Sequence, residues 1–338
     1  MDGRRLHEED NWFQGDDLIS IKFIQDYGYG SCSDEKLIRT GETRDCTNEE
    51  KARDLIKRGF AEEIKFGWIP QQEDKRDYTI NFSLLPGLPA ILPVSCDLRT
   101  TGFMPPIVDQ GQHGTCTANA KAGINGYMTA KQGHPSFSFS RNFIYYKTVK
   151  DIEGGNPASD PGATIRGTFQ EGQRFGSCQE AIWPYDNAHF GIVPNAAALA
   201  EALNYQDLFY ALLDPTNTPV TTILSNAKNM LAAGYPFEFG FRVYPSYTQV
   251  KADGLWPYPK AGEQYMGGHA VLAVGYDDTK VCPNTQKPGA FLVRNSWGAS
   301  WGMAGYFYLP YEFITRSYNG ARLMSDMWAI GKIKWMNV

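Results

Sequence analysis

No apolar stretch of this sequence is long enough to span a bilayer, and no block of lysine and arginine residues stands out. Residues 1–9 are largely charged, unlike a secretory signal, which needs an apolar centre. The 32 basic and 37 acidic side chains give a formal net charge of −5, which suits neither a nucleic-acid groove nor an anionic membrane surface. We therefore expect a cytoplasmic protein that binds neither nucleic acid nor membrane.

Cysteine is scarce as well, and its spacing is irregular. The spacing matches neither a disulfide framework nor the CxxC pairs of a zinc ribbon, so we expect mostly reduced thiols. The stretch GYGSCS has Ser33 where a phosphate-binding fingerprint needs glycine, which argues against nucleotide binding. We expect no metal and no cofactor. The six cysteines are Cys32, Cys46, Cys96, Cys116, Cys178 and Cys282.

One of these cysteines has the surroundings of a reactive thiol. Cys116 stands in DQGQHGTCTANA, at the predicted start of a helix that continues through Met128. The unpaired N–H groups and the positive dipole end of a helix lower the pKa of a thiol placed there. Gln110 lies six residues earlier, and Gly111 and Gly114 allow a turn that returns its amide to the sulfur as an oxyanion donor. Taken alone, a small buried cysteine is the competing interpretation.

Two downstream motifs favour the reactive interpretation. His269 follows two glycines and opens the apolar run AVLAVGY, and Asn295 begins NSWGASWG after a strand-like stretch. In their order and their residues, three motifs resemble the papain-like cysteine peptidases: DQGxxGxCxA, GHAVxxVGY and NSWGxxWGxxGY. A fourth motif, GWIPxxxDxRDY, is similar to the segment that precedes the peptidase domain in bacterial and phage-type members. The resemblance implies Cys116 as nucleophile, His269 as base, Asn295 as the residue that orients the histidine, and Gln110 as oxyanion donor.

The same resemblance implies contacts to the substrate. Where many relatives have a glycine pair that hydrogen-bonds an extended substrate, this chain has Gly162 and Ala163, and Gly162 is the better match. A turn glycine before a helix is the alternative interpretation. Gly268 lies next to the base, and Trp297 would shield the histidine–asparagine hydrogen bond from water. Secreted relatives carry a bridged cysteine where this chain has His113, so packing or His113 itself must hold the loop.

For residues 94–338 the resemblance implies an α+β, two-lobed papain-like fold, with a helical lobe and an antiparallel, barrel-like sheet lobe. The residue patterns agree with this fold class. Predicted helices lie at 116–128, after the cap Ser140, and at 163–174, 196–203 and 223–233; predicted strands lie at 236–241, 270–276, 290–294 and 305–309.

Residues 1–66 predict a small α/β module. Residues 18–24 alternate like a half-buried strand, Thr47 and Glu50 form the capping box of a helix, and FAEEI predicts another strand. This order resembles a module of phage head and tail proteins, which would associate the protein with a phage or virion. Three interpretations stay open: a module that docks to a partner protein or to the peptidase domain itself, an unusual prosegment, and an uninformative extension.

Residues 67–93 predict an extended linker, because prolines near its end favour polyproline II geometry. N-terminal segments of the family commonly block the active site, so we expect this linker to cross the cleft and suppress activity. A linker packed on the back of a lobe is the alternative. The apolar side chains expected in the groove are Tyr78, Ile80, Phe82, Leu84 and Leu85.

Together these features predict a cysteine endopeptidase that hydrolyses peptide bonds in protein or peptide substrates through a thioester, with a zymogen-like N-terminal segment. A catalytically silent binding protein on the same fold would usually lack one member of the catalytic set, and none is missing. A thiol acyltransferase would need an amine acceptor site, which the sequence does not reveal. Both remain alternatives.

Overall fold

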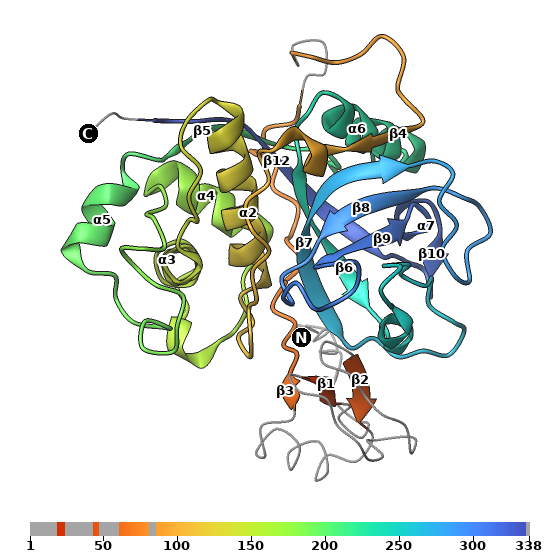
Figure 1. The fold of residues 1–338 in the computed structure, drawn as a ribbon, viewed down its shortest axis with the longest axis horizontal. Helices are drawn as coiled ribbons and strands as arrows, with labels where there is room; N and C mark the ends of the chain where they lie inside the picture. The colour runs from red at the N-terminus through yellow and green to blue at the C-terminus, as the bar shows by residue number, and fades with distance from the viewer. Residues whose placement is uncertain (1–18, 24–42, 47–60, 81–85, 336–338) are drawn as a thin grey trace, which may run out of the picture.

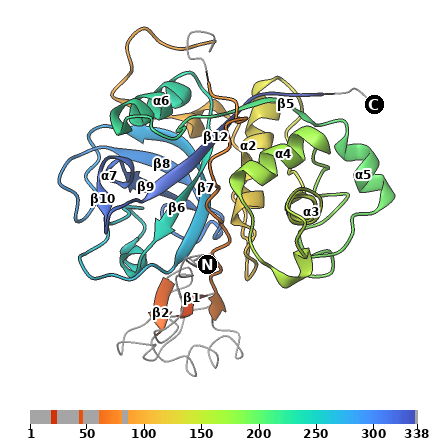
Figure 2. The same cartoon turned by 180° about the vertical axis from the view of Figure 1, so that it is seen from behind.

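The computed structural model describes residues 19–23, 43–46, 61–80 and 86–335, with only the backbone described before residue 64. Helices gather on one side of the molecule and an antiparallel sheet on the other (Figure 1). A segment from the N-terminal part of the chain runs between these two lobes, and Figure 2 shows the same arrangement from behind. The predicted α+β, two-lobed architecture is confirmed.

Four α-helices build the helical lobe, and several begin at a side-chain cap. Ser140 Oγ accepts a hydrogen bond from Phe143 N, and Thr164 Oγ1 accepts one from Gly167 N. Such caps satisfy N–H groups that a helix start leaves unpaired. The first helix is central, since every residue from 116 to 129 is buried. The elements are α2 (Cys116–Lys131), α3 (Arg141–Lys147), η3 (Thr148–Ile152), η4 (Pro157–Ser159), α4 (Ile165–Arg174) and α5 (Ala196–Ala202).

A seven-stranded sheet forms the second lobe, and all of its strand pairs are antiparallel. The order is β5-β12-β6-β7-β8-β9, with β4 paired to β7. Strands β6, β7 and β8 are buried along nearly their whole length and form the core of this lobe. The strands are β4 (Ser95–Asp97), β5 (Asp207–Leu212), β6 (Phe237–Val243), β7 (Gly267–Asp277), β8 (Ala290–Arg294), β9 (Tyr306–Pro310) and β12 (Met324–Ile333).

A small N-terminal sheet and several further elements complete the fold. A three-stranded sheet of order β2-β1-β3 lies below the two lobes in Figure 1. Its strands are β1 (Ile19–Phe23), β2 (Thr43–Cys46) and β3 (Ala61–Glu63). The sheet lobe also contains η2 (Leu98–Thr101), α6 (Val220–Ala232), η5 (Pro245–Gln249), α7 (Glu312–Thr315), β10 (Ser317–Tyr318) and β11 (Ala321–Arg322).

Most predicted elements are present within a few residues of their expected bounds. The predicted helices of residues 94–338 correspond to α2 through α6, and the predicted strands to β1, β3 and β6 through β9. The sequence patterns do not reveal β5 and β12. In β12, Asp326 and Lys332 interrupt the apolar run, so its periodicity is weak. The helix expected after Thr47 lies outside the described residues.

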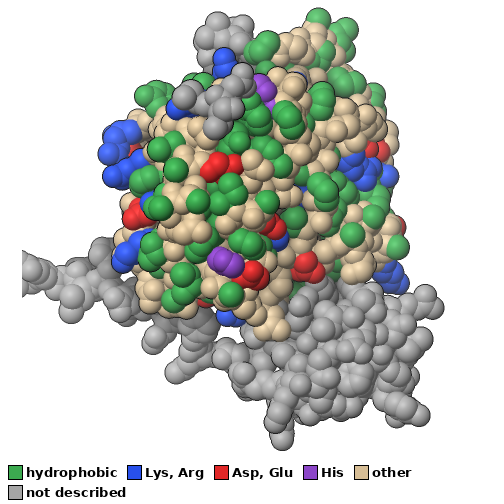
Figure 3. All heavy atoms as spheres, turned by 60° about the vertical axis from the view of Figure 1, so that its left-hand side comes forward, with side chains coloured by type: hydrophobic (Ala, Val, Ile, Leu, Met, Phe, Trp, Pro, Cys, Tyr) green, Lys and Arg blue, Asp and Glu red, His purple; other side chains and the backbone are tan. Residues whose placement is uncertain are grey.

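The surface carries no broad field of one charge on the face that Figure 3 shows, where acidic and basic side chains are dispersed among apolar and neutral ones. Within the described ranges, no helix is long and apolar enough to cross a membrane.

Candidate active site

Cys116 is the first residue of α2 and lies buried between the two lobes. Its Sγ accepts a hydrogen bond from Ala270 N on β7 at 3.4 Å, and the N–H of Gly67 also points to it. Thr115, which precedes the helix, makes no side-chain cap, so its hydroxyl does not compete for the N–H groups of the first turn. The sulfur therefore lies where the sequence predicts it, at a helix N-terminus that faces a neighbouring strand.

His269 and Asn295 are brought together by two adjacent strands. His269 belongs to β7, and Asn295 follows β8, which pairs with β7. His269 Nε2 and Asn295 Oδ1 are 2.8 Å apart, and Nε2 donates because an amide oxygen only accepts. Nδ1 has no hydrogen-bond partner and is the nitrogen left for the thiol. Trp297 stacks on the imidazole, with ring centres 4.7 Å apart and planes at 21°, and covers the pair.

Gln110 is oriented by a residue that the sequence motifs do not single out. Ser296 Oγ donates to Gln110 Oε1 at 2.6 Å, and Gln110 N donates to Ser296 O at 2.8 Å. Because Oε1 is engaged, Nε2 points the other way and donates to Lys65 O at 3.0 Å and to His113 O at 2.9 Å. The carbonyl oxygen of Lys65 therefore accepts a hydrogen bond from the amide that the sequence predicts as the oxyanion donor.

Two further side chains hold the loop before Cys116. The carboxylate of Asp160 accepts hydrogen bonds from Gly114 N, 3.0 Å from each oxygen. The hydroxyl of Tyr185 donates to Gln110 O at 2.8 Å and lies 2.6 Å from Thr115 Oγ1. The sequence assigns the WPYD motif, which contains Tyr185, only a packing role. No local pattern indicates Asp160, because its contact spans 46 residues of chain.

His113 braces the flank of this loop, in agreement with one of the two possibilities that the sequence leaves open. Its ring stacks on Phe190 at 3.8 Å, and its Nε2 is 2.9 Å from Asn187 Oδ1. The free thiols in the described part of the chain are Cys96, Cys116, Cys178 and Cys282.

Residues 64–80, called the strap below, run between the two lobes and form hydrogen bonds with both (Figure 1). Gly67 O accepts a hydrogen bond from Ala163 N at 2.8 Å, and Ile69 N donates to Ala163 O at 3.0 Å. On the other side, Trp68 N donates to Gly268 O at 2.9 Å. The strap thus pairs with backbone groups of both lobes, as an extended peptide would.

The structure differs from the sequence expectation that Gly162 is the better match for hydrogen bonding to an extended substrate. Gly162 N donates to the hydroxyl of Tyr145 at 3.1 Å, so Ala163, and not Gly162, offers the groove both an N–H and a C=O group. Gly162 has another use. A Cβ atom there would overlap Gly67 O, so the absence of a side chain lets the strap approach.

The side chains that fill the groove also differ from the expected ones. Phe66 and Trp68 face the active site, and Trp68 is only 5% exposed. Tyr78 is 65% exposed, and Ile80 is half-buried. The other three apolar residues expected there, Phe82, Leu84 and Leu85, lie outside the described residues.

Burial under the strap keeps the catalytic pair uncharged. Loss of water raises the pKa of Cys116 to about 11, although N–H groups such as that of Ala270 act in the opposite direction. Burial also lowers the pKa of His269 to about 4, against the effect of its hydrogen bond to Asn295. A thiol and a neutral imidazole therefore coexist at neutral pH. The lowered thiol pKa that the sequence predicts from the helix N-terminus is therefore not found in the covered site.

Comparison with known proteins agrees with this geometry. Residues 92–319 match the profile described as papain family cysteine protease. An uncharacterized peptidase C1-like protein, L477 of Acanthamoeba polyphaga mimivirus, is 34% identical over 284 residues, which cover 79% of this chain and 87% of that protein. Cathepsin K of Mus musculus is 26% identical over 262 residues, which cover 76% of this chain and 70% of the cathepsin.

Solved structures show the same similarity. Xylellain, a cysteine protease from Xylella fastidiosa, superposes with a TM-score of 0.65 at 33% identity and covers 80% of this chain and 96% of its own. Procathepsin B from Trypanosoma congolense gives a TM-score of 0.56 at 18% identity, over 78% of this chain and 85% of its own. At that identity the second likeness concerns the fold alone.

Proposed function

The chain belongs to the papain family of cysteine proteases, and on this basis we propose that it is an endopeptidase held inactive by its own strap. The family supplies the enzyme class, a cysteine-type peptidase that hydrolyses peptide bonds. One observation carries the finer proposal. Strap backbone lies against the sulfur of Cys116 and the amide of Gln110, where a substrate has to bind.

In the proposed reaction, the proton of Cys116 passes to His269 Nδ1 and the sulfur attacks the substrate carbonyl carbon. Gln110 Nε2 stabilises the oxyanion, in the position that Lys65 O now occupies. His269 then protonates the leaving amine as the C–N bond breaks and a thioester remains. Water, deprotonated by His269, hydrolyses the thioester. Asn295 keeps the imidazole oriented without adding a second buried charge.

The position of His269 determines the direction in which a substrate lies. The ring of Phe66 packs edge-on against His269 and Trp297, with ring centres 6.2 Å away in both cases. Because His269 must protonate the leaving amine, the leaving-group side of a substrate lies where Phe66 lies. The acyl side then extends toward Trp68. The strap runs from Phe66 to Trp68, so its direction is opposite to that of a substrate.

This reversed direction explains how the strap can fill the cleft without being cut. The backbone group that faces Cys116 Sγ is the N–H of Gly67, where a substrate would present a carbonyl carbon. In the proposed arrangement the sulfur therefore meets a hydrogen-bond donor of the strap. A bound segment of this kind excludes water and substrate, which makes it an inhibitor.

Contacts outside the catalytic centre keep the strap in place. Arg166 donates two hydrogen bonds to the carboxylate of Asp77, at 2.9 and 2.5 Å, and Leu212 N donates to Tyr78 O at 2.7 Å. Because the strap is tethered to the domain that it blocks, its effective concentration is high and weak contacts suffice. Strand β2 also lies against η5 of the sheet lobe, which favours docking of the N-terminal module onto the peptidase domain itself.

An epoxide thiol trap followed by peptide mapping tests this proposal. We expect the trap to modify Cys116 faster in the Trp68→Ala full chain than in the wild type. The matched control is Ile69→Ala, because Ile69 is 41% exposed on the same strap. This substitution should change the labelling rate little. Equal rates in all three proteins would argue against inhibition by the strap. Peptide hydrolysis by a folded Cys116→Ala variant would argue against the mechanism.

A further inference from the structure

The loop of residues 110–116 carries two groups that can stabilise an oxyanion in the proposed reaction. Gln110 supplies a side-chain amide, and Cys116 supplies a backbone N–H group, which a helix start leaves without an intrahelical partner. Thr115, which precedes the helix, makes no side-chain cap. The two donors can act on one oxygen atom only if the loop between them keeps a fixed shape.

Both lobes hold Gln110 in place. On the sheet lobe, Ser296 O accepts a hydrogen bond from Gln110 N at 2.8 Å, and Ser296 Oγ donates to Gln110 Oε1 at 2.6 Å. On the helical lobe, the hydroxyl of Tyr185 donates to Gln110 O at 2.8 Å. The remaining group of Gln110, Nε2, donates to the strap at Lys65 O. Tyr185 therefore ties Gln110 to the lobe that carries Cys116.

The same hydroxyl also contacts the residue before Cys116. Tyr185 Oη lies 2.6 Å from Thr115 Oγ1. A hydroxyl has one proton, and that of Tyr185 is donated to Gln110 O, so Thr115 donates to Tyr185. Thr115 Oγ1 in turn accepts a hydrogen bond from Asn119 Nδ2 at 3.0 Å. A directed chain of hydrogen bonds thus runs from the first turn of α2 to the carbonyl oxygen of Gln110.

Arg141 of α3 holds the ring of Tyr185. Its guanidinium carbon lies 3.7 Å from the ring centre, and its Nη1 donates to Asp109 O at 2.9 Å and to Asn119 Oδ1 at 3.0 Å. Nε and Nη2 donate to the carboxylate of Glu180 at 2.9 and 2.8 Å. A guanidinium over an aromatic face is attracted to it, and this one is fixed by its own hydrogen bonds. The ring and its hydroxyl therefore have little freedom to move.

The hydroxyl of Tyr185 is a donor at neutral pH. Burial raises the pKa of Tyr185 to about 12, although the contacts with Thr115 and Arg141 act against this rise. The hydroxyl therefore keeps its proton, and the hydrogen bond to Gln110 O persists.

We propose that Tyr185 is a positioning residue of the peptidase: its hydroxyl sets the place of the Gln110 amide relative to Cys116, so that both donors meet the same oxyanion. The inference rests on the proposed function, because only a reaction that passes through an oxyanion needs this alignment. It gives a role in the reaction to a residue whose sequence motif indicates packing alone. Without the hydroxyl, the Gln110 carbonyl and the Thr115 hydroxyl each lose a partner, and the loop can relax.

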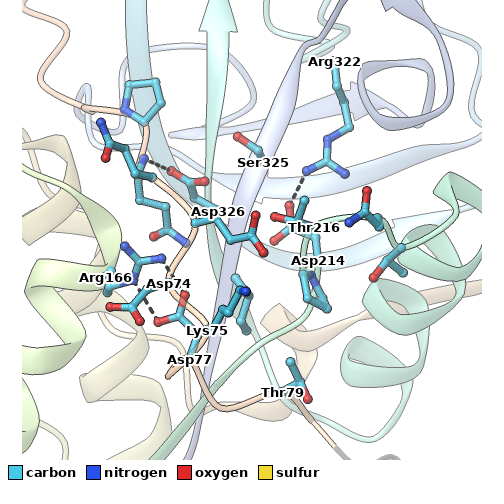
Figure 4. A pocket seen from close by; sticks show the side chains of 18 residues that line it. Asp74, Lys75, Asp77, Thr79, Arg166, Asp214, Thr216, Arg322, Ser325 and Asp326 are labelled. Atoms are coloured by element: carbon cyan, nitrogen blue, oxygen red, sulfur yellow. Dashed lines mark hydrogen bonds and ion pairs between the residues drawn. The ribbon is translucent and has the colours of Figure 1, made fainter.

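The test needs an open cleft, which Trp68→Ala should provide in the full chain. The indole of Trp68 lies against strands β6 and β7, and its Nε1 donates to Asp326 Oδ2 at 3.1 Å. Gln71 N donates to the same oxygen at 2.9 Å, and Figure 4 shows this carboxylate turned toward the strap. These partners of the indole belong to the sheet lobe, whereas Tyr185 lies between α4 and α5 of the helical lobe. The substitution therefore removes no partner of Tyr185.

The first measurement compares Tyr185→Phe with its Trp68→Ala parent on one fluorogenic peptide. We expect kcat to fall about 3- to 30-fold with KM little changed, which is less than the loss of about 10²- to 10³-fold for a whole oxyanion donor. The rate of Cys116 alkylation by iodoacetamide should stay as in the parent, because displacement of iodide passes through no oxyanion. A merely structural role would lower both rates.

Three further variants separate the hydroxyl from general packing. Tyr276→Phe removes another phenol hydroxyl that donates to a backbone carbonyl, Pro93 O at 2.7 Å, at the end of β7 remote from the active site, and it should change neither rate. Thr115→Val breaks the chain of hydrogen bonds on the other side of Tyr185 and should lower kcat by a similar factor. Thr115→Ser keeps a hydroxyl and should recover most of this loss. If Tyr185→Phe does not fold, Thr115→Val carries the same test.

A double-mutant comparison shows whether Tyr185 acts through Gln110. In Gln110→Ala there is no amide to position, so the addition of Tyr185→Phe should lower kcat by less than about twofold. The full loss in this background, an unchanged kcat in Tyr185→Phe alone, or an equal loss of alkylation and hydrolysis overturns the inference, while peptide hydrolysis leaves the proposed function standing. Failure of the parent to cleave any peptide, with Cys116 unreactive to iodoacetamide, refutes the proposed function and this inference with it.

Discussion

A Cβ atom on Gly67 of the strap would overlap the carbonyl oxygen of Gly114, in the loop two residues before the nucleophile. From the other side, a Cβ atom on Gly162 would overlap the carbonyl oxygen of Gly67. The strap therefore passes the active site with backbone against backbone. Because no side chain takes part, rotation of a side chain cannot relieve a clash there.

We predict that Gly67→Ala opens the cleft. Overpacking of a tight site costs about 1–3 kcal/mol, which would shift the equilibrium between the bound and the displaced strap toward displacement by roughly 5- to 150-fold. The rate of Cys116 labelling by a thiol trap should rise in proportion. Glu73→Ala, an exposed change on the same strap, is the control and should leave the rate as in the wild type. A Gly67→Ala protein that labels no faster than the control would contradict the backbone contact.

The pH dependence of Cys116 alkylation should report the state of the strap. In the covered site, burial raises the pKa of the Cys116 thiol to about 11, so the thiolate is present only at strongly alkaline pH. Removal of the strap restores water and removes the main cause of that rise, so the pKa should fall. We expect the rate of alkylation by iodoacetamide to rise at lower pH in Gly67→Ala than in the wild type. Superimposable pH profiles of the two proteins would show that the strap does not control the pKa of the Cys116 thiol.

Ser296 should affect turnover through the orientation of Gln110. In the Trp68→Ala enzyme, Gln110→Ala should lower kcat by about 10²- to 10³-fold, the usual loss for one oxyanion donor. Ser296→Ala removes only the hydrogen bond that orients the amide, so a decrease of about 2- to 10-fold is expected. Ser296→Thr keeps a hydroxyl and should recover most of this loss. If the Ser296 variants raise KM and leave kcat unchanged, Ser296 binds substrate and does not position Gln110.

The sequence could place the proposed catalytic residues near one another because each stands in a short motif at the end of a helix or strand. Cys116 follows a glycine turn, and His269 and Asn295 lie at the edges of apolar strands. Local sequence determines such element ends, and strand pairing then brings the residues together. The sequence could therefore identify the site although its parts lie more than 150 residues apart.

The contacts of the strap could not be predicted in the same way. The most apolar part of residues 67–93 has the composition that suits a groove, yet Phe66 and Trp68 fill it. Their positions follow from backbone pairing with Ala163 and Gly268, and no periodicity in the sequence reports such pairing. The sequence does not indicate the contact of Asp326 with the strap for a similar reason. The direction of the Asp326 side chain depends on a shift of register within β12.

A buried group of charges links the two lobes behind the active site. Lys121 of α2 and Asp207 of β5 form an ion pair of 2.9 Å with both side chains fully buried. Glu171 of α4 and Glu238 of β6 lie within electrostatic reach of this pair, and the carboxyl oxygens of Glu238 have no hydrogen-bond partner. If all three acids were ionised, one lysine would face three negative charges in the core. Burial therefore raises the pKa of Glu171 and Glu238 well above the usual value.

Because folding raises these two pKa values, we predict that the protein loses stability as pH rises. A carboxyl group whose pKa is raised by folding stabilises the native state fully below its unfolded pKa, and this contribution declines as pH rises toward the folded pKa. A tenfold difference in proton affinity between the folded and unfolded states corresponds to about 1.4 kcal/mol. We therefore expect the free energy of unfolding in urea, measured in the Cys116→Ala protein to prevent self-cleavage, to fall as the pH rises above about 5. Glu238→Gln cannot ionise, so its stability should fall less steeply over the same range, even if its unpaired amide makes it less stable at every pH.

Glu73→Gln, at an exposed position, should keep the steeper decline of the parent protein. Identical slopes for the parent protein and Glu238→Gln would mean that Glu238 is already ionised in the fold.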